Sequence, residues 1–387
     1  MATGTKRKLA ALLLVTVSSA LAVLLAEAGL RLALNPADFL HATLVSDSVL
    51  GHRIRPLTTG HDALGFRNRE VPGHANVVAI GDSFTYGVSA PRDGSWPQQL
   101  SGLLGETAYN MGLGGYGPLQ YLQLARTTAR QLNPRVWVVG FYFGNDLMDS
   151  YYVAHGLSHW KEWRLSVRPS GDLTEFDKAG MAGPKKRFAG LRDWLSRHSL
   201  LYSVARATVL QHLGSQEREE MVRQSAPDVQ WSWRDPARVD VRTVFTPQVR
   251  LAAVNLDSGP VREGLQISQR ALAAIQTEAD NQSVRLILVL IPTKERAYCA
   301  QLKLTATTLP ASHAALCVAE DKTKAELMRY VGERGIHTVD ATQALEAQIE
   351  RHVQLYPVNS DGHLQSSGYA VIAKLAADAI RLHAARP

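Results

Sequence analysis

The chain has 387 residues, of which 45% are hydrophobic and 20% are charged, a composition that is ordinary for a globular protein with a core. This length favours one large domain, or one domain with a large insertion, behind a separate N-terminal segment. The net charge is +7, three charges of which lie in one N-terminal triplet, and the basic cluster at residues 183–188 lacks interleaved aromatic residues. The charge pattern therefore argues against a nucleic-acid partner.

The N-terminus predicts a membrane-spanning helix. The basic residues 6–8 precede Leu9–Ala26, a run of 18 residues without a charge, and the apolar pattern resumes weakly as far as residue 34. A helix of about 20 residues spans a bilayer, and a basic flank stays on the cytoplasmic side. We therefore expect residues 1–8 to form a cytoplasmic tail and residues 9–34 a transmembrane signal anchor, with the remainder of the chain outside the cytoplasm, in the periplasm.

A cleaved signal peptide is the alternative for this N-terminus, and it would release a secreted protein. Ala26–Ala28 offers small residues for cleavage, but the apolar run is long for a signal peptide, so we favour the anchor. No cysteine lies near the segment, which excludes lipoprotein processing.

Beyond a turn-rich lead-in segment at residues 35–75, short apolar runs alternate with helical patterns. The predicted strands span 76–82, 106–112, 136–144, 284–292 and 336–341. The predicted helices span 95–105, 118–132, 198–213, 263–280, 321–335 and 366–385. Strands that alternate with helices indicate a parallel, doubly wound α/β sheet, in which ligands bind at the carboxyl ends of the strands.

The alternation stops between residues 148 and 260, a stretch that carries five of the seven tryptophans. We expect this stretch to be an insertion that caps the edge of the sheet and divides an α/β domain made of residues 76–147 and 261–387. Its tryptophans could line a carbohydrate site, but packing within the insertion is the use that we favour for most of them.

The loops after the predicted strands carry a set of residues with complementary chemistry. Ser83 follows the first strand and is a nucleophile once a base takes its proton. His363, in the loop before the last helix, is a base suited to neutral pH, and Asp361 would orient its imidazole. The backbone N–H groups of Ser83 and a loop glycine and the side-chain amide of Asn145 would donate hydrogen bonds to an oxyanion. Each motif alone has a structural explanation; their joint placement predicts an acyl-transfer site.

With these residues the sequence resembles the SGNH hydrolases, also called GDSL esterases. The four signature residues of the family match Ser83 in "GDSF", Gly115 in "NMGLGGYG", Asn145 in "GND" and His363 in "DGHLQSSGY". The family's residue before the glycine loop matches Asn110. The resemblance covers about half the chain, residues 76–146 and 285–380, and "LGFRNRE" ahead of the first strand is similar to a membrane-anchored bacterial branch.

The resemblance implies a flavodoxin-like three-layer α/β/α fold with a central parallel five-stranded sheet. It also implies a catalytic Ser83, His363 and Asp361, and an oxyanion hole made by Ser83, Gly115 and Asn145. Asp82, Asn110 and Asp146 would support this site. Many members place the acid three residues before the histidine, where this chain has Ser360; others place it two before, so we assign the role to Asp361.

Two other patterns in the sequence, a glycine motif and a pair of cysteines, suggest a cofactor, a metal or a disulfide. Gly112, Gly114 and Gly117 match the dinucleotide fingerprint G-x-G-x-x-G, but they follow the second strand and no acid ends the next one, so we expect no NAD and no other cofactor. Cys299 and Cys317 predict a disulfide outside the cytoplasm, the alternative being two reduced thiols. Two cysteines without a nearby histidine pair are too few ligands for zinc, and we expect no metal.

The sequence thus predicts a membrane-anchored serine esterase that cleaves acyl esters, with acetyl favoured, of a carbohydrate or lipid through an acyl-enzyme. An O-acetyltransferase that moves the acetyl group onto an extracytoplasmic polysaccharide is the alternative within the enzymes, and "IPTKERAY" at residues 291–298 is similar to segments in such relatives. An inactive carbohydrate-binding protein on the same scaffold is the alternative of another class.

Overall fold

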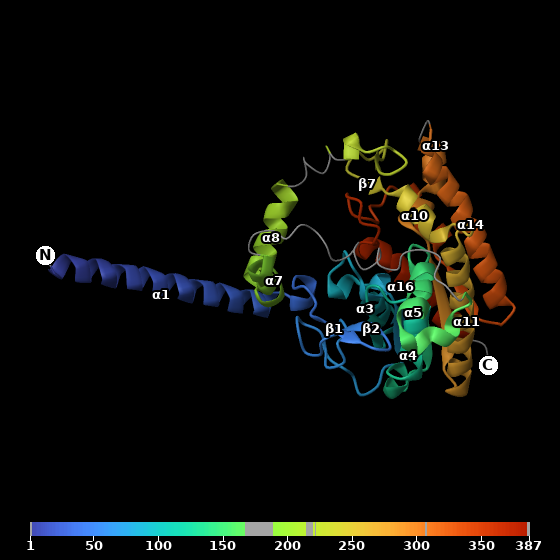
Figure 1. The fold of residues 1–387 in the computed structure, drawn as a ribbon, viewed down its shortest axis with the longest axis horizontal. Coiled ribbons are helices and arrows are strands. Elements are labelled where there is room, and N and C mark those ends of the chain that lie inside the picture. The colour runs from blue at the N-terminus through green and yellow to red at the C-terminus, as the bar shows by residue number, and fades with distance from the viewer. Residues whose placement is uncertain (1, 167–188, 214–219, 221, 306–307, 385–387) are drawn as a thin grey trace.

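The computed structural model describes residues 2–166, 189–213, 220, 222–305 and 308–384. It consists of a compact α/β body from which one long helix, α1 (Ala2–Ala33), extends away (Figure 1). Within α1, Arg7–Ala33 is long and apolar enough to cross a membrane, with a mean hydropathy of 2.5 and no part of it buried in the body. The predicted basic cluster at residues 183–188 lies outside the described residues.

The centre of the body is the predicted sheet. Its five parallel strands are β3 (Val77–Gly81), β4 (Ala108–Gly112), β5 (Val136–Tyr142), β8 (Arg285–Ile291) and β9 (His337–Asp340). They lie in the order β4-β3-β5-β8-β9, which is the strand order of flavodoxin-like folds. The predicted fold class is confirmed. The order reverses between β3 and β5, and this switch point is where such sheets bind ligands.

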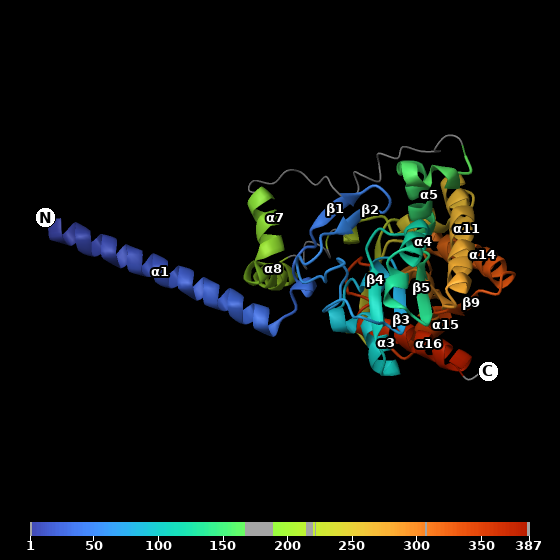
Figure 2. The same ribbon diagram turned by 90° about the horizontal axis from the view of Figure 1, so that it is seen from below.

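Two helical layers cover the sheet, as Figure 2 shows. Alternate strand residues face opposite layers, so Val77 and Ala79 belong to one core and Val78 and Ile80 to the other. One layer contains α4 (Pro118–Arg126), α5 (Asp146–Gly156), α11 (Gly259–Asn281) and α14 (Ala311–Gly332). The other contains α3 (Trp96–Leu104), α12 (Lys294–Ala297), α13 (Cys299–Thr305), α15 (Thr342–Glu350) and α16 (Ser366–Ala384). Because both faces are covered, the inner strands β3, β5 and β8 are almost wholly apolar, whereas the edge strand β9 is only partly buried and carries His337 and Asp340.

Several predicted helices have other bounds in the structure. The helix predicted at 118–132 is broken: α4 ends at Arg126, the Thr127 hydroxyl donates to the carbonyl of Gln123 (2.7 Å), and the 3₁₀ helix η3 (Ala129–Leu132) follows. A β-branched residue that bonds back to the preceding turn favours such an end. The helix predicted to begin at 321 begins ten residues earlier, directly after Pro310, and its early turns bury Leu316.

The lead-in segment holds more structure than predicted. The strands β1 (Leu44–Asp47) and β2 (Gly51–Ile54) form an antiparallel hairpin, and the carboxylate of Asp47 accepts the N–H groups of Val49 and Leu50 in its turn (both 2.9 Å). The 3₁₀ helix η1 (Pro36–Asp38) also lies in this segment, and the short helices α2 (Ser83–Tyr86) and η2 (Arg92–Gly94) follow β3.

Residues 148–260 contain both layer helices and peripheral elements. The elements that lie wholly within this stretch are η4 (Ser158–Trp163), α7 (Ala189–His198), α8 (Leu200–Leu213), β6 (Trp231–Arg234), β7 (Arg242–Phe245) and α10 (Pro247–Val254). Trp160 is buried, and Trp231 and Trp233 lie against Phe245 and Tyr298 with ring centroids 5.0 and 5.2 Å apart, respectively. Most of the described tryptophans here serve packing, whereas Trp194 is 55% exposed.

Candidate active site

Ser83 is the first residue of α2, directly after β3. Asp82 caps this helix, because its Oδ1 accepts the N–H of Phe84 (2.8 Å). The aspartate rather than the serine is therefore the cap. The Ser83 hydroxyl lies 3.3 Å from the other carboxylate oxygen of Asp82, Oδ2, and has a second, closer partner.

That partner is His363. The Oγ of Ser83 lies 2.8 Å from Nε2 of His363, and Nδ1 of His363 lies 2.6 Å from Oδ1 of Asp361. An ionised carboxylate only accepts hydrogen bonds, so Nδ1 carries the proton and Nε2 accepts from the serine hydroxyl. The structure thus brings Ser83 to a histidine 280 positions later in the chain and to that histidine's neighbouring aspartate, in the arrangement that activates a serine for acyl transfer.

Asp361 is held in its ionised form. Burial alone would raise the pKa of Asp361, but hydrogen bonds from the His363 side chain and backbone and from the Ser89 hydroxyl, together with the charge of a protonated His363, hold that pKa well below its usual range. Ser360, the residue one position earlier, is exposed. The geometry therefore selects the acid two residues before the histidine.

Lys294 supports the loop that carries these two residues, and the sequence did not single it out. Its side chain is fully buried, and Nζ donates to the carbonyls of Val244 (2.5 Å), Asn359 (3.2 Å) and Asp361 (2.9 Å). Burial lowers the pKa of Lys294 to about 8. The sequence signal available for Lys294 was its position just after β8, within "IPTKERAY". In the structure, this lysine hydrogen-bonds to the backbone of the loop that carries His363.

The backbone donors expected for an oxyanion lie beside Ser83. Among the described residues, neither the N–H of Ser83 nor that of Gly115 has an acceptor. Gly115 has φ +77°, which favours glycine, and a Cβ on its neighbour Gly114 would lie 3.7 Å from the Ser83 Cβ. His52 of the unpredicted hairpin steadies this loop, with Nε2 2.9 Å from the carbonyl of Gly114.

Asn145 lies between β5 and α5, and its side chain has a partner that the sequence did not suggest. Its amide nitrogen donates to Oδ2 of Asp149 (2.5 Å), one helical turn later, while its Oδ1 is buried without a partner among the described residues. An amide carries two N–H bonds, so one remains for an oxyanion or for Asp82. Asp149 thus orients the third predicted donor.

The predicted supporting acids are buried beside this amide. The Oδ1 of Asp146 accepts the Tyr121 hydroxyl (2.9 Å) and its Oδ2 accepts the N–H of Tyr142 (3.0 Å), which fixes the end of β5. Burial raises the pKa of Asp146 well above its usual value and that of Asp149 to about 7. Burial also raises the pKa of Asp82, although hydrogen bonds from Phe84, Ser83 and Asn145 oppose the rise.

The remaining supporting residue, Asn110, orders the glycine loop. It is fully buried, its amide donates to the carbonyl of Thr85 (2.8 Å), and its Oδ1 accepts the N–H of Gly112 (2.8 Å). A Cβ on Gly112 would lie 2.1 Å from the backbone nitrogen of Tyr86. The first glycine of the dinucleotide-like pattern therefore has a structural cause, which is the close approach of α2.

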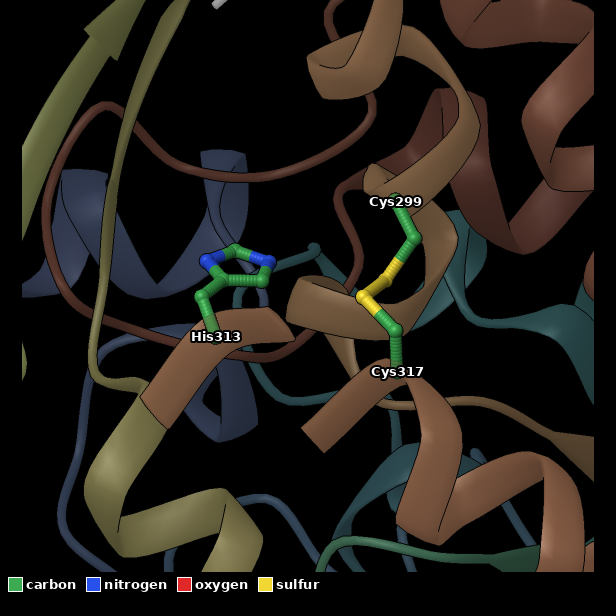
Figure 3. Close-up of side chains that lie close together, drawn as sticks. All are labelled: Cys299, His313 and Cys317. Atoms are coloured by element: carbon green, nitrogen blue, oxygen red, sulfur yellow. A yellow bond between two sulfur atoms is a disulfide. The ribbon is translucent and has the colours of Figure 1, made fainter. Parts of the chain in front are cut away.

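Cys299 and Cys317 are joined by a disulfide, with His313 beside it (Figure 3). These three residues have the composition of a small metal site, since their ligand atoms all lie within 4.8 Å. Both nitrogens of His313 have other partners, however: Nδ1 accepts from Trp231 (3.2 Å) and Nε2 donates to the carbonyl of Glu295 (3.0 Å). The donor set therefore does not fit a metal, because the sulfurs are oxidised and the imidazole is already engaged.

Comparisons with known proteins give matches in structure and none in sequence. No protein-family model and no curated protein sequence matches the chain. A structure from Desulfitobacterium hafniense DCB-2, described as belonging to the G-D-S-L family, is similar over 78% of this chain and 98% of its own, at 14% identity and a TM-score of 0.35. A GDSL-like lipase from Bacteroides thetaiotaomicron VPI-5482 is similar over 79% of this chain and 88% of its own, at 12% identity and the same TM-score.

Proposed function

We propose that the chain is a serine esterase of the SGNH hydrolase family that cleaves acyl esters, with acetyl favoured, of a carbohydrate or lipid. The observation that carries this proposal is the hydrogen-bonded series Ser83–His363–Asp361 at the carboxyl ends of the strands. The unpaired N–H groups of Ser83 and Gly115 beside it support the same reaction.

The reaction follows from these contacts. As the Oγ of Ser83 attacks the ester carbonyl carbon, Nε2 of His363 takes the hydroxyl proton, and Asp361 stabilises the imidazolium. The carbonyl oxygen gains negative charge and accepts the free N–H groups of Ser83 and Gly115 and the second N–H of Asn145. The carbon–oxygen bond to the alcohol then breaks, and the alcohol leaves with the proton from Nε2. Water, deprotonated by His363, attacks the acyl-enzyme and releases the acid and free Ser83.

The same acyl-enzyme would serve an acetyltransferase if a sugar hydroxyl replaced the water. Acetyl esters supplied with and without oligosaccharide acceptors separate the two: free acetate indicates hydrolysis, and acetylated sugar indicates transfer. Ser83→Ala should abolish either reaction while leaving the fold intact by circular dichroism. No ester cleavage by the correctly folded wild type would refute both enzymes and favour the inactive binding protein.

We propose further that α1 stays attached as a membrane anchor, with the α/β body outside the cytoplasm as the basic flank predicts. The support is a set of contacts at Glu27, inside the segment that signal cleavage would cut. Its carboxylate accepts the N–H groups of Leu200 and Leu201 and the hydroxyl of Ser199, each at 3.0 Å, and so caps α8. A membrane-bound product of full mass is expected; a soluble product that lacks residues 1–28 would contradict the anchor.

A further inference from the structure

Arg250, on α10, lies beside the active-site loop and makes no hydrogen bond within the part of the chain that the structure describes. One of its terminal nitrogens, Nη2, lies 2.9 Å from the position that a Cβ on Gly362 would occupy, and Gly362 stands between Asp361 and His363. Among the described residues, no acceptor bonds its guanidinium: Nε is buried and unpaired, and the two Nη atoms reach solvent. A half-buried guanidinium with five N–H bonds and no acceptor is unusual in a folded protein.

The described carboxylates near Arg250 accept no hydrogen bond from its guanidinium. Asp361 is engaged by His363 and Ser89. Glu295, which is fully buried, accepts the N–H of Thr246 through Oε1 (2.8 Å), while its Oε2 is buried without a hydrogen bond among the described residues. The neighbours that raise the pKa of Arg250 are Tyr142 first and then Glu295, Asp361 and Glu320, and among the described residues none of them hydrogen-bonds to its guanidinium. The helix thus holds a positive group next to the catalytic base while leaving its donors free.

The position of Arg250 defines what it would bind. A guanidinium presents paired N–H groups that match the two oxygens of a carboxylate or phosphate, and such a contact is strengthened where water is partly excluded. Gly362 lets this fork rest against the backbone of the loop, one residue from His363.

We propose that Arg250 binds an anionic group of the substrate, a carboxylate or a phosphate, so that the preferred ester is one that carries a negative charge close to its acyl group. This inference rests on the proposed esterase function. It assigns to the insertion a part in substrate choice, since α10 belongs to residues 148–260.

The test compares matched esters with the full-length enzyme. The substrates are an O-acetylated methyl uronoside, its methyl ester, which has the same shape without the charge, and an O-acetylated methyl hexoside 6-phosphate. We expect kcat/KM to be about 10- to 100-fold higher for an anionic substrate than for the methyl ester, the range of a charge-assisted contact. The larger of the two anionic rates identifies the carboxylate or the phosphate as the ligand.

Arg250→Met should bring the ratio of anionic to neutral kcat/KM close to one, and Arg250→Lys should retain part of it. Arg130→Met is the matched control, because Arg130 is exposed on η3 before the amino end of β5, and it should leave the ratio unchanged. A wild-type ratio near one, or a ratio that survives in Arg250→Met, overturns this inference alone. If the folded enzyme cleaves none of the three esters and no simple acetyl ester either, the proposed function is overturned instead. Thermal unfolding verifies the fold, and if Arg250→Met does not fold, the wild-type ratio and Arg250→Lys decide.

A second inference rests on the junction of α1 with α7 and α8, which lie beside the C-terminal end of α1 in both views (Figures 1 and 2). Besides the Glu27 contacts, Arg31 donates to the carbonyl of His198 at the end of α7 (2.6 Å). On α7, Leu191 is 57% exposed and Trp194 is 55% exposed. The body thus presents apolar side chains where the apolar helix ends.

The length of the apolar run sets the depth of this junction. Leu9–Ala26 spans about 27 Å as a helix, close to the hydrocarbon thickness of roughly 30 Å, so Glu27 and Arg31 would lie at the outer boundary of the bilayer. Tryptophan is enriched at this level of membranes. We infer that α7 lies on the outer lipid surface with Leu191 and Trp194 in the interface, which would hold the active site near the membrane.

Spin labels on the full-length protein in lipid nanodiscs test this arrangement. A nitroxide at Leu191→Cys should be more accessible to oxygen and less accessible to an aqueous nickel chelate than one at Leu103→Cys, a 44% exposed position on α3 of the body. Equal accessibility to the chelate at both sites would overturn the inference.

Discussion

Replacing Asp361 by asparagine tests the activation of Ser83 with almost no change of shape. The Asp361 carboxylate accepts Nδ1–H of His363 at 2.6 Å, which leaves Nε2 free to take the serine proton. An amide can instead donate to Nδ1, which places the imidazole proton on Nε2 and blocks proton transfer. We expect kcat to fall about 10⁴-fold, as in triads that lose the correct tautomer, or roughly 5.5 kcal/mol of transition-state stabilisation.

The assay is steady-state hydrolysis of a soluble acetyl ester by the full-length protein, with Ser360→Ala as the control. Ser360 is exposed and occupies the alternative position for the acid, so its replacement should leave kcat within a few fold. A loss below 10-fold in Asp361→Asn, or an equal loss in Ser360→Ala, would refute the assignment of Asp361.

The same substitution also changes the dependence of stability on pH. The pKa of Asp361 is depressed in the folded state, so its carboxylate stabilises the fold above the unfolded value of about 3.9, and this contribution fades as pH falls further. The free energy of unfolding of the wild type should therefore decline more steeply below about pH 4 than that of Asp361→Asn.

Three further changes are expected to have measurable effects. Asn145→Ala should lower kcat about 10²- to 10³-fold with little change in KM in steady-state assays, because it removes a donor used mainly in the transition state; a change in KM alone would contradict this role. Asp149→Asn should flatten the pH dependence of stability between about pH 4 and 7. Burial raises the pKa of Asp149 to about 7, so the wild type loses stability, on the order of 4 kcal/mol, as pH rises through this window. If urea unfolding gives the same change of the free energy of unfolding with pH for both proteins, this prediction is wrong. Reduction of the Cys299–Cys317 disulfide, which closes a loop of separation 18, should lower the free energy of unfolding by about 3 kcal/mol in calorimetry; an unchanged melting temperature after verified reduction would count against it.

Local patterns carried most of the information on the fold. Each predicted strand overlaps an observed one, because a fully buried parallel strand must be a short apolar run between turn formers. Helix ends were less predictable: α14 begins at Ala311 and α4 stops at Arg126, where side-chain hydrogen bonds and burial of particular turns decide. The β1–β2 hairpin escaped notice because its two strands are only partly buried, so their sequences are not distinctly apolar.

For the site, as for the fold, local sequence patterns indicated one part and the packing of the elements decided the rest. Ser83, Gly115, Asn145, Asp361 and His363 could be singled out because each lies in a short motif after a strand or before a helix, and a parallel sheet brings the ends of its strands to one rim. The chemical roles of the side chains in these motifs can be recognised from the residue types alone. The assignment of the acid to Asp361 came from the resemblance to the SGNH hydrolases, together with the presence of Ser360 rather than an acid at the other position that the family uses.

What the sequence by itself determined is therefore the order of the elements, the sheet and the residues at its rim. Only the tertiary structure decided how those residues are held: Lys294 donates to the backbone of the histidine loop, and Asp149 accepts a hydrogen bond from Asn145. It also decided that Glu27 of α1 caps α8. It further decided that Arg250 lies beside Gly362 of the histidine loop with no hydrogen bond to any described residue. Such partners come from distant segments without a motif of their own, and only the packing of one element on another determines whether a charge is paired, buried or left open to a ligand.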